Sequence, residues 1–161
     1  AWVLRRIERH GGDPSRVVVG GHSAGGHLTA MCLQTPWAED YGLSQDPLVG
    51  ALMISGLYDL QPLRYSLMQP LIQLDDGVIR RNSPMFSVRE CTTPAMVTWG
   101  GDEPDEFRRQ SDDFLAEWTS VGNLAKRFEQ PSANHFTAIY RFEDPKSMLC
   151  QWVAQAVGTR R

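Results

Sequence analysis

VVVGGHSAGG (residues 17–26) joins a predicted strand to a predicted helix, and this junction indicates the class of fold. The β-branched run within residues 16–20 is typical of a strand that is buried on both faces, as in a parallel sheet. Residues 24–33 favour a helix, whose apolar side we expect to be Leu28, Met31 and Cys32. A plain turn needs fewer glycines than the four that surround this serine, so we expect a tight bend.

The segment Gly21-His22-Ser23-Ala24-Gly25 fits the pattern G-x-S-x-G. Between a strand and a helix, this pattern indicates a nucleophile elbow, a strained turn that projects the serine hydroxyl above the sheet. We expect glycine at Gly21 and Gly25 because side chains there would clash across the turn. The helix that starts near Ala24 has free N–H groups, which stabilise negative charge on a substrate oxygen. A glycine-rich turn with a capping serine is the alternative interpretation.

The rest of the chain alternates predicted strands and predicted helices. We expect strands at residues 48–55, 95–99 and 125–130, and helices at residues 1–9, 105–121 and 146–157. The composition favours a loop at residues 37–46, a mixture of short pieces at residues 59–75 and a turn at residues 81–84. This alternation predicts an α/β fold in which helices flank a mostly parallel sheet.

Length and composition exclude several classes of function. With 161 residues, of which 42% are hydrophobic, the chain is long enough for a core, and we expect a single domain over residues 1–161. A formal net charge of −3 and scattered basic residues argue against nucleic-acid binding. No stretch approaches the roughly 18 apolar residues of a membrane span, so we expect no membrane partner.

The cysteines and histidines do not form a metal-binding pattern. The three cysteines, Cys32, Cys91 and Cys150, are odd in number and far apart, with no spacing typical of zinc. We therefore expect no metal and no cofactor. We also expect reduced, mostly buried thiols, which are typical of a cytoplasmic protein.

A serine hydroxyl is a poor nucleophile at neutral pH and requires a base. An elbow therefore predicts an acid and then a histidine further along the chain. His135 follows the last predicted strand, and three acids follow the strand at residues 95–99: Asp102, Glu103 and Asp105. Because ligands of such sheets bind beyond the carboxyl ends of the strands, we expect these side chains to meet Ser23 at one rim. The residues alone leave open which acid orients the imidazole.

Other side chains near the predicted strand ends are candidates for a substrate pocket. Tyr58 and Asp59 follow the strand at residues 48–55, and we prefer to interpret them as a packed tyrosine and a capping aspartate. Trp99 and Phe136 flank the candidate acid and base. Each of these two rings either contacts an aromatic substrate or belongs to the core.

Five segments carry a resemblance to a known family and together span most of the chain: residues 21–29 (GHSAGGHLT), 54–63 (ISGLYDLQPL), 82–84 (NSP), 100–111 (GGDEPDEFRRQS) and 135–136 (HF). They resemble the C-terminal part of an α/β-hydrolase of the kynurenine formamidase (arylformamidase) group and related small esterases. The resemblance implies the α/β-hydrolase fold without its N-terminal strands. In this family the acid lies four residues before the Phe of the EFxRQS segment, which is Glu103 here. Many members have Asp at that place, so Asp102 remains an alternative.

The resemblance implies a serine hydrolase that cleaves the N-formyl amide of an aromatic amine, N-formylkynurenine, to kynurenine and formate in tryptophan catabolism. In that reaction Ser23 attacks the carbonyl, His135 transfers the serine proton to the leaving group, and Glu103 holds His135. The backbone N–H of Ala24 supplies one oxyanion contact. A general carboxylesterase with the same triad and a non-catalytic binding protein of this fold are the alternatives. We expect a small aromatic substrate as the partner, and a homodimer is left open.

Such enzymes carry further oxyanion donors in an HGG-type segment on an earlier loop, whereas this chain begins one helix upstream of the elbow and its own His10-Gly11-Gly12 ends that helix. We therefore expect the chain to be an N-terminally incomplete part of a longer protein. Loss of one oxyanion donor typically lowers the rate about a hundred- to a thousandfold, so we expect the chain alone to be weakly active or inactive. Missing strands leave apolar sheet edges exposed, so we also expect it to be poorly soluble.

Overall fold

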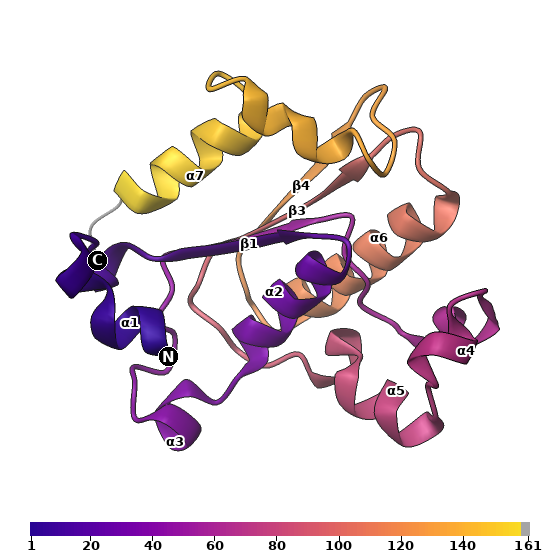
Figure 1. Cartoon of the computed structure of the whole chain (residues 1–161), viewed down its shortest axis with the longest axis horizontal. Coiled ribbons are helices and arrows are strands. Elements are labelled where there is room, and N and C mark those ends of the chain that lie inside the picture. The colour runs from indigo at the N-terminus through magenta and orange to yellow at the C-terminus, as the bar shows by residue number, and fades with distance from the viewer. Residues whose placement is uncertain (159–161) are drawn as a thin grey trace.

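A four-stranded parallel sheet forms the centre of the computed structural model, which describes residues 1–158 (Figure 1). The strands lie in the sheet in chain order: β1 (Val18–His22), β2 (Gly50–Ile54), β3 (Ala95–Gly100) and β4 (Ala125–Gln130). Each neighbouring pair is parallel, as the alternation of strands and helices predicted. Because parallel strands are joined by crossovers, the carboxyl ends of all the strands lie at one rim.

Helices cover both faces of this sheet. Helix α7 (Met148–Gly158) lies on one face, whereas α2 (Ala24–Gln34) and α6 (Asp105–Ser120) lie on the other (Figure 1). The shorter α-helices are α1 (Trp2–Arg6), α3 (Trp37–Tyr41), α4 (Gln69–Ile72) and α5 (Asp76–Asn82). Short 3-10 helices lie at Ile7–His10, Pro14–Arg16, Gln61–Tyr65, Pro84–Ser87 and Ala138–Glu143.

Strand β2 supplies side chains to two cores, because successive residues of a strand point to opposite faces. Ala51 and Met53 belong to the cluster with α2 and α6. Leu52 and Ile54 belong to the cluster on the other face, which also contains Leu149 of α7. All the residues of β2 are buried, which explains its continuous apolar sequence GALMI.

Two expectations about burial are wrong. Strand β1 begins at Val18, later than predicted, and its residues are half-buried or exposed, because within the described sheet β1 has a neighbour on one side only. Helix α2 does not turn Leu28, Met31 and Cys32 inward: Leu28 is 61% exposed, and the other two are half-buried. The buried side of α2 consists mainly of smaller residues, which let it approach β1 and β2 closely: Gly26, Thr29, Ala30 and Leu33.

Two short helices lie where the sequence predicted none. Helix α3 falls within the predicted loop at residues 37–46, and the indole N–H of Trp37 ties it back to the carbonyl of Cys32. Helix α5 extends into the predicted turn at residues 81–84, and Asp75 caps its start by accepting a hydrogen bond from the N–H of Val78. Helices of 5 and 7 residues are too short to show a periodic apolar pattern.

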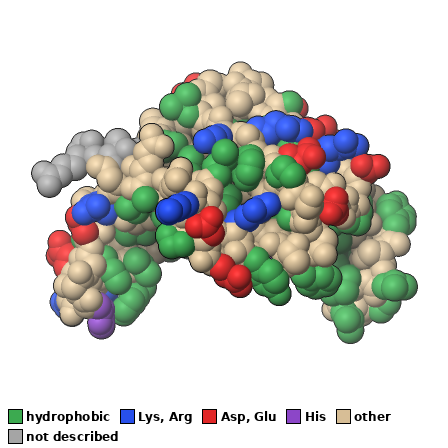
Figure 2. All heavy atoms as spheres, turned by 90° about the horizontal axis from the view of Figure 1, so that it is seen from above, with side chains coloured by type: hydrophobic (Ala, Val, Ile, Leu, Met, Phe, Trp, Pro, Cys, Tyr) green, Lys and Arg blue, Asp and Glu red, His purple; other side chains and the backbone are tan. Residues whose placement is uncertain are grey.

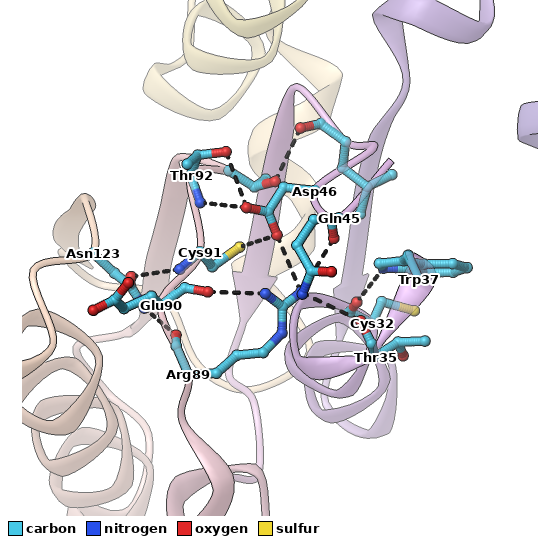
Figure 3. Close-up of polar contacts among 12 residues, drawn as sticks. Cys32, Thr35, Trp37, Gln45, Asp46, Arg89, Glu90, Cys91, Thr92 and Asn123 are labelled. Atoms are coloured by element: carbon cyan, nitrogen blue, oxygen red, sulfur yellow. Dashed lines mark hydrogen bonds and ion pairs between the residues drawn. The ribbon is translucent and has the colours of Figure 1, made fainter. Parts of the chain in front are cut away.

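A polar network joins the loops that precede β2 and β3 (Figure 3). The carboxylate of Asp46 accepts hydrogen bonds from the N–H and hydroxyl of Thr92 and from the thiol of Cys91, and it pairs with Arg89 at 3.1 Å. Burial by itself would raise the pKa of Asp46, but these hydrogen bonds outweigh it and lower that pKa below its usual value. The ionised carboxylate therefore holds the two loops together.

The three cysteines are free thiols. Only Cys91 is buried, whereas Cys32 and Cys150 are half-buried, so the expectation of mostly buried thiols is wrong. Burial raises the pKa of Cys32 and of Cys91, which keeps both thiols protonated and weakly nucleophilic near neutral pH.

Charged side chains of both signs are interspersed on the face shown in Figure 2, with hydrophobic side chains between them.

Within residues 1–158, no helix combines the length and the apolar character that are needed to cross a bilayer.

Candidate active site

Ser23 lies in the tight bend between β1 and α2. The last residue of β1, His22, is the register partner of Ile54 in β2, and the N–H of Ser23 donates to the carbonyl of Ile54 at 2.9 Å. Ser23 has φ 58° and ψ −118°, a conformation that costs a residue other than glycine about 1–3 kcal/mol. The strained strand–turn–helix segment expected from the sequence is therefore present at this position.

The glycines of the bend are not equally required. A Cβ at Gly21 would lie 2.3 Å from the carbonyl oxygen of Gly25, which is the clash expected across the turn. A Cβ at Gly25 would meet nothing within 4 Å, so the clash expected at that position is wrong. The second crowded position is Gly26, whose Cβ would lie 2.8 Å from the Cα of Gly56. The reason is that residue 26, not residue 25, faces the segment that follows β2.

His135 lies on the loop after β4 and reaches Ser23 across the rim. Its Nε2 is 3.1 Å from Oγ of Ser23, and its Nδ1 is 2.5 Å from Oε1 of Glu103. Asn134 shapes this loop, because its side-chain oxygen accepts hydrogen bonds from the N–H groups of residues 136 and 137. We assign the imidazole proton to Nδ1, because an ionised carboxylate only accepts hydrogen bonds. The lone pair of Nε2 then faces the serine hydroxyl.

Glu103 is the acid that contacts the imidazole. Its side chain is 1% exposed, and its second oxygen, Oε2, accepts hydrogen bonds from the hydroxyl of Ser55 and the N–H of Gly100, both at 2.9 Å. The other two candidate acids, Asp102 and Asp105, are exposed. The structure thus brings Ser23, His135 and Glu103 together at the rim.

Two residues that frame this site, Ser55 and Gln110, were missed by sequence reasoning. Ser55 binds Glu103, while the buried Gln110 of α6 accepts hydrogen bonds from the N–H groups of Tyr58 and Asp59 at 2.7 and 2.9 Å. Both residues lie in segments quoted above for the family resemblance, SGLYDL and EFRRQS. Those segments were the only signal that pointed to them.

Three rings surround the imidazole of His135. The ring centroids of His22 and Phe107 each lie 4.6 Å from that of His135, and Phe136 lies edge-on at 5.8 Å. Burial and, after it, the neighbouring His135 lower the pKa of His22, which favours its neutral form. His22 therefore belongs to the surroundings of the candidate base, because its ring packs against the imidazole of His135.

The further pocket candidates differ in exposure. Tyr58 is fully buried and stacks on Phe114 with centroids 4.3 Å apart, so it belongs to the core. The carboxylate of Asp59 accepts a hydrogen bond from the N–H of Gln61 at 2.9 Å, which is the capping role predicted for Asp59 from the sequence. Trp99 is 1% exposed and is likewise a core residue, whereas Phe136 is 76% exposed beside His135. Of these residues, Phe136 is the one that is free to meet a ligand.

Ala24, which directly follows Ser23, is the first residue of α2. The first N–H groups of a helix have no acceptor within the helix and lie at the positive end of its dipole. A hydroxyl, an imidazole, a buried carboxylate and N–H donors at one rim are the groups that acyl transfer requires. Within residues 1–158, no three or more His, Cys, Asp or Glu side chains are grouped so that they could hold a metal ion.

The sequence pattern of the alpha/beta hydrolase fold matches residues 1–138. The chain belongs to the alpha/beta hydrolase fold family. Kynurenine formamidase of Danio rerio is 33% identical to this hydrolase-fold chain over 144 residues, which cover 86% of this chain and 48% of that protein. Esterase LipQ of Mycobacterium tuberculosis is 29% identical over an alignment of 176 positions, which covers 98% of this chain and 40% of that protein.

Solved structures agree with the alpha/beta hydrolase fold. A Silicibacter protein superposes with a TM-score of 0.79 at 26% identity, over 94% of this chain and 55% of that chain. The esterase of Pyrobaculum calidifontis superposes with a TM-score of 0.68 at 21% identity, over 98% of this chain and 57% of that chain, a likeness that concerns the fold alone. The fold predicted from the sequence is confirmed. The chain spans about half the length of the curated relatives it matches, 48% and 40% for the two named above.

Proposed function

We propose that the intact protein is a serine hydrolase in which Ser23 is the nucleophile, His135 the general base and Glu103 the acid that orients His135. The observation that carries this proposal is one chain of contacts, 3.1 Å from Ser23 to His135 and 2.5 Å from His135 to Glu103. The three side chains come from segments that follow three different strands. A hydroxyl that is hydrogen-bonded to an oriented imidazole is activated as a nucleophile.

In the first step, Oγ of Ser23 attacks the substrate carbonyl while its proton passes to Nε2 of His135. Glu103 stabilises the imidazolium, and the N–H of Ala24 donates to the developing oxyanion. The imidazolium then protonates the leaving group, and an acyl-serine ester remains. In the second step, His135 takes a proton from water, whose oxygen attacks the acyl-serine ester. The imidazolium then returns the proton to Oγ of Ser23 as the ester bond breaks, which releases the acid and free Ser23.

We propose the N-formyl amide of an aromatic amine as the substrate, with N-formylkynurenine as the compound to test. Two relatives support this choice by their names, the kynurenine formamidases of Danio rerio and Salmo salar, which are 33% and 31% identical. Phe136 supports it by position, because an exposed aromatic ring lies beside the base that protonates the leaving group. An aromatic leaving group can stack on such a ring.

A general carboxylesterase is the second candidate. The observation that favours it is the similarity to esterase LipQ, which extends over 98% of this chain. The proposed triad attacks an ester and a formamide by the same steps, so the two candidates differ in substrate and not in chemistry.

Labelling of the intact protein with a fluorophosphonate probe tests the class of enzyme. We expect labelling of the wild type and of the control Ser120→Ala, in which an exposed serine is removed, and no labelling of Ser23→Ala. A folded wild type that is not labelled would refute the hydrolase proposal and favour a non-catalytic binding protein.

Comparison of kcat/KM for N-formylkynurenine and for p-nitrophenyl acetate then tests the substrate. A clear preference for N-formylkynurenine would support the formamidase. The reverse preference would support the carboxylesterase.

A further inference from the structure

Ser55 holds the place at the end of β2 that Ser23 holds at the end of β1. It directly follows Ile54, the register partner of His22, just as Ser23 directly follows His22. Both serines have a positive φ, 49° at Ser55 and 58° at Ser23. A strained conformation of this kind persists only where the surrounding structure over-determines it, and such residues cluster at functional sites.

The surroundings of Ser55 fix its backbone from both sides. The residue is fully buried, and its N–H donates to the carbonyl of Thr98 in β3 at 2.8 Å. The loop that follows it is held by Gln110 through the N–H groups of Tyr58 and Asp59. The hydroxyl of Ser55 is therefore presented from a rigid part of the fold.

That hydroxyl binds the acid of the candidate site. It donates to Oε2 of Glu103 at 2.9 Å, and the N–H of Gly100 donates to the same oxygen at 2.9 Å. The other oxygen of the carboxylate, Oε1, lies 2.5 Å from Nδ1 of His135. Because the Glu103 side chain is 1% exposed, water does not reach its carboxylate, and these protein donors stabilise the negative charge instead.

We propose that Ser55 is a positioning residue, whose hydroxyl fixes the carboxylate of Glu103 in the orientation in which Oε1 binds His135. The inference rests on the proposed serine-hydrolase function. It adds Ser55 to the three residues of the proposed triad. Donors from the ends of β2 and β3 bind one carboxylate oxygen and thereby stop rotation about the last bond of the side chain. A glutamate has one more rotatable bond than an aspartate, so it gains more from a second anchor.

A purely local role for Ser55, as a small residue in a left-handed conformation, makes different predictions. Ser55→Gly removes the hydroxyl but suits a positive φ, whereas Ser55→Ala removes the hydroxyl and keeps the backbone strain. In a local role, the glycine variant would be as active as wild type. If the hydroxyl positions Glu103, both variants lose activity to the same extent, although the glycine variant is the more stable.

We expect kcat of the intact protein to fall about tenfold to a hundredfold in both variants, with KM unchanged, because a hydrogen bond to a charged group is lost. The matched control is Ser83→Ala, which removes another fully buried serine hydroxyl, one that accepts a hydrogen bond from the N–H of Leu60. We expect this control to keep the wild-type kcat. Ser55 variants with kcat within about twofold of wild type would overturn the inference.

A double-mutant cycle with Glu103→Gln tests whether Ser55 acts through Glu103. We expect Ser55→Gly to change kcat of the Glu103→Gln variant by less than about twofold, whereas the effects of two independent residues would multiply. Multiplying effects would overturn the inference. A wild type that neither hydrolyses substrate nor reacts with the fluorophosphonate probe would refute the proposed function and this inference with it. An active wild type with unaffected Ser55 variants would refute the inference alone.

Discussion

Replacement of Glu103 by glutamine tests the candidate site with a nearly isosteric change. An amide has one accepting and one donating end, and the structure decides where each end goes. The position of Oε2 faces two donors, the Ser55 hydroxyl and the Gly100 N–H, both at 2.9 Å, so the amide oxygen takes that position. The amide NH2 group then faces Nδ1 of His135, which must become an acceptor.

This exchange moves the imidazole proton from Nδ1 to Nε2. A protonated Nε2 cannot accept the proton of Ser23, whose Oγ lies 3.1 Å away. We therefore expect Glu103→Gln to lower kcat of the intact protein about 10⁴-fold, which corresponds to an increase of about 5 kcal/mol in the activation free energy. The measurement is the steady-state hydrolysis of p-nitrophenyl acetate, with KM expected to change little.

The neighbouring Asp102 provides the matched control, because it is the other candidate acid. It is exposed, and it holds its loop through its backbone N–H, which donates to the carbonyl of Ala133 at 2.9 Å. Asp102→Asn keeps that bond, so we expect kcat within about twofold of wild type. If Glu103→Gln retained more than about a tenth of the wild-type kcat, or if Asp102→Asn lost more activity than Glu103→Gln, Glu103 would not be the acid that orients His135.

Three further predictions concern the bend, the polar network and the pocket. Gly21→Ala places a Cβ 2.3 Å from the carbonyl oxygen of Gly25, so we expect the free energy of unfolding in denaturant to fall by about 3 kcal/mol. Gly25→Ala is the control and should not destabilise the protein, since its Cβ meets nothing within 4 Å; equal losses would contradict the steric argument. Asp46→Ala should lower the free energy of unfolding by about 3 kcal/mol at neutral pH, and the exposed Asp40→Ala by less than about 0.5 kcal/mol. Because folding lowers the pKa of Asp46, its contribution is complete above the unfolded-state pKa of about 3.9 and is lost as the pH falls through the folded-state value, so a difference that did not shrink in acid would argue against the network. Phe136→Ala should raise KM for N-formylkynurenine about tenfold and leave KM for a short aliphatic ester unchanged, whereas equal changes for both substrates would exclude Phe136 from substrate recognition.

The parts of the fold that could be predicted have a signature within a short segment. Strand β4 has the predicted bounds, Ala125–Gln130, and α6 begins at the predicted residue, Asp105, because a proline precedes it and its buried face repeats with helical period. The bend at Ser23 carries its glycines on either side. In each case, neighbours along the chain determine the local backbone.

The parts that could not be predicted depend on contacts between distant segments. The inward side of α2 is set by how closely the helix approaches β2, and no local pattern reports that distance. Ser55 lies in a left-handed conformation that a serine rarely adopts, and its partner Glu103 is 48 residues away. The three candidate acids lie within four residues of one another in the sequence, so periodicity cannot rank them, and the family resemblance was the signal that pointed to Glu103.

The loop after β3 explains why Glu103 is the acid that meets His135. The N–H of Glu103 donates to the carbonyl of Gly100, which closes a turn, and the carboxylate folds back to accept the N–H of Gly100. A Cβ at Gly100 would lie 2.2 Å from the carbonyl oxygen of Ala133, so glycine is what lets the loop of the acid touch the loop of the histidine. Gly100 thus sets both the approach of the two loops and the direction of the Glu103 carboxylate. Along the sequence, the same glycine predicts only the end of a strand.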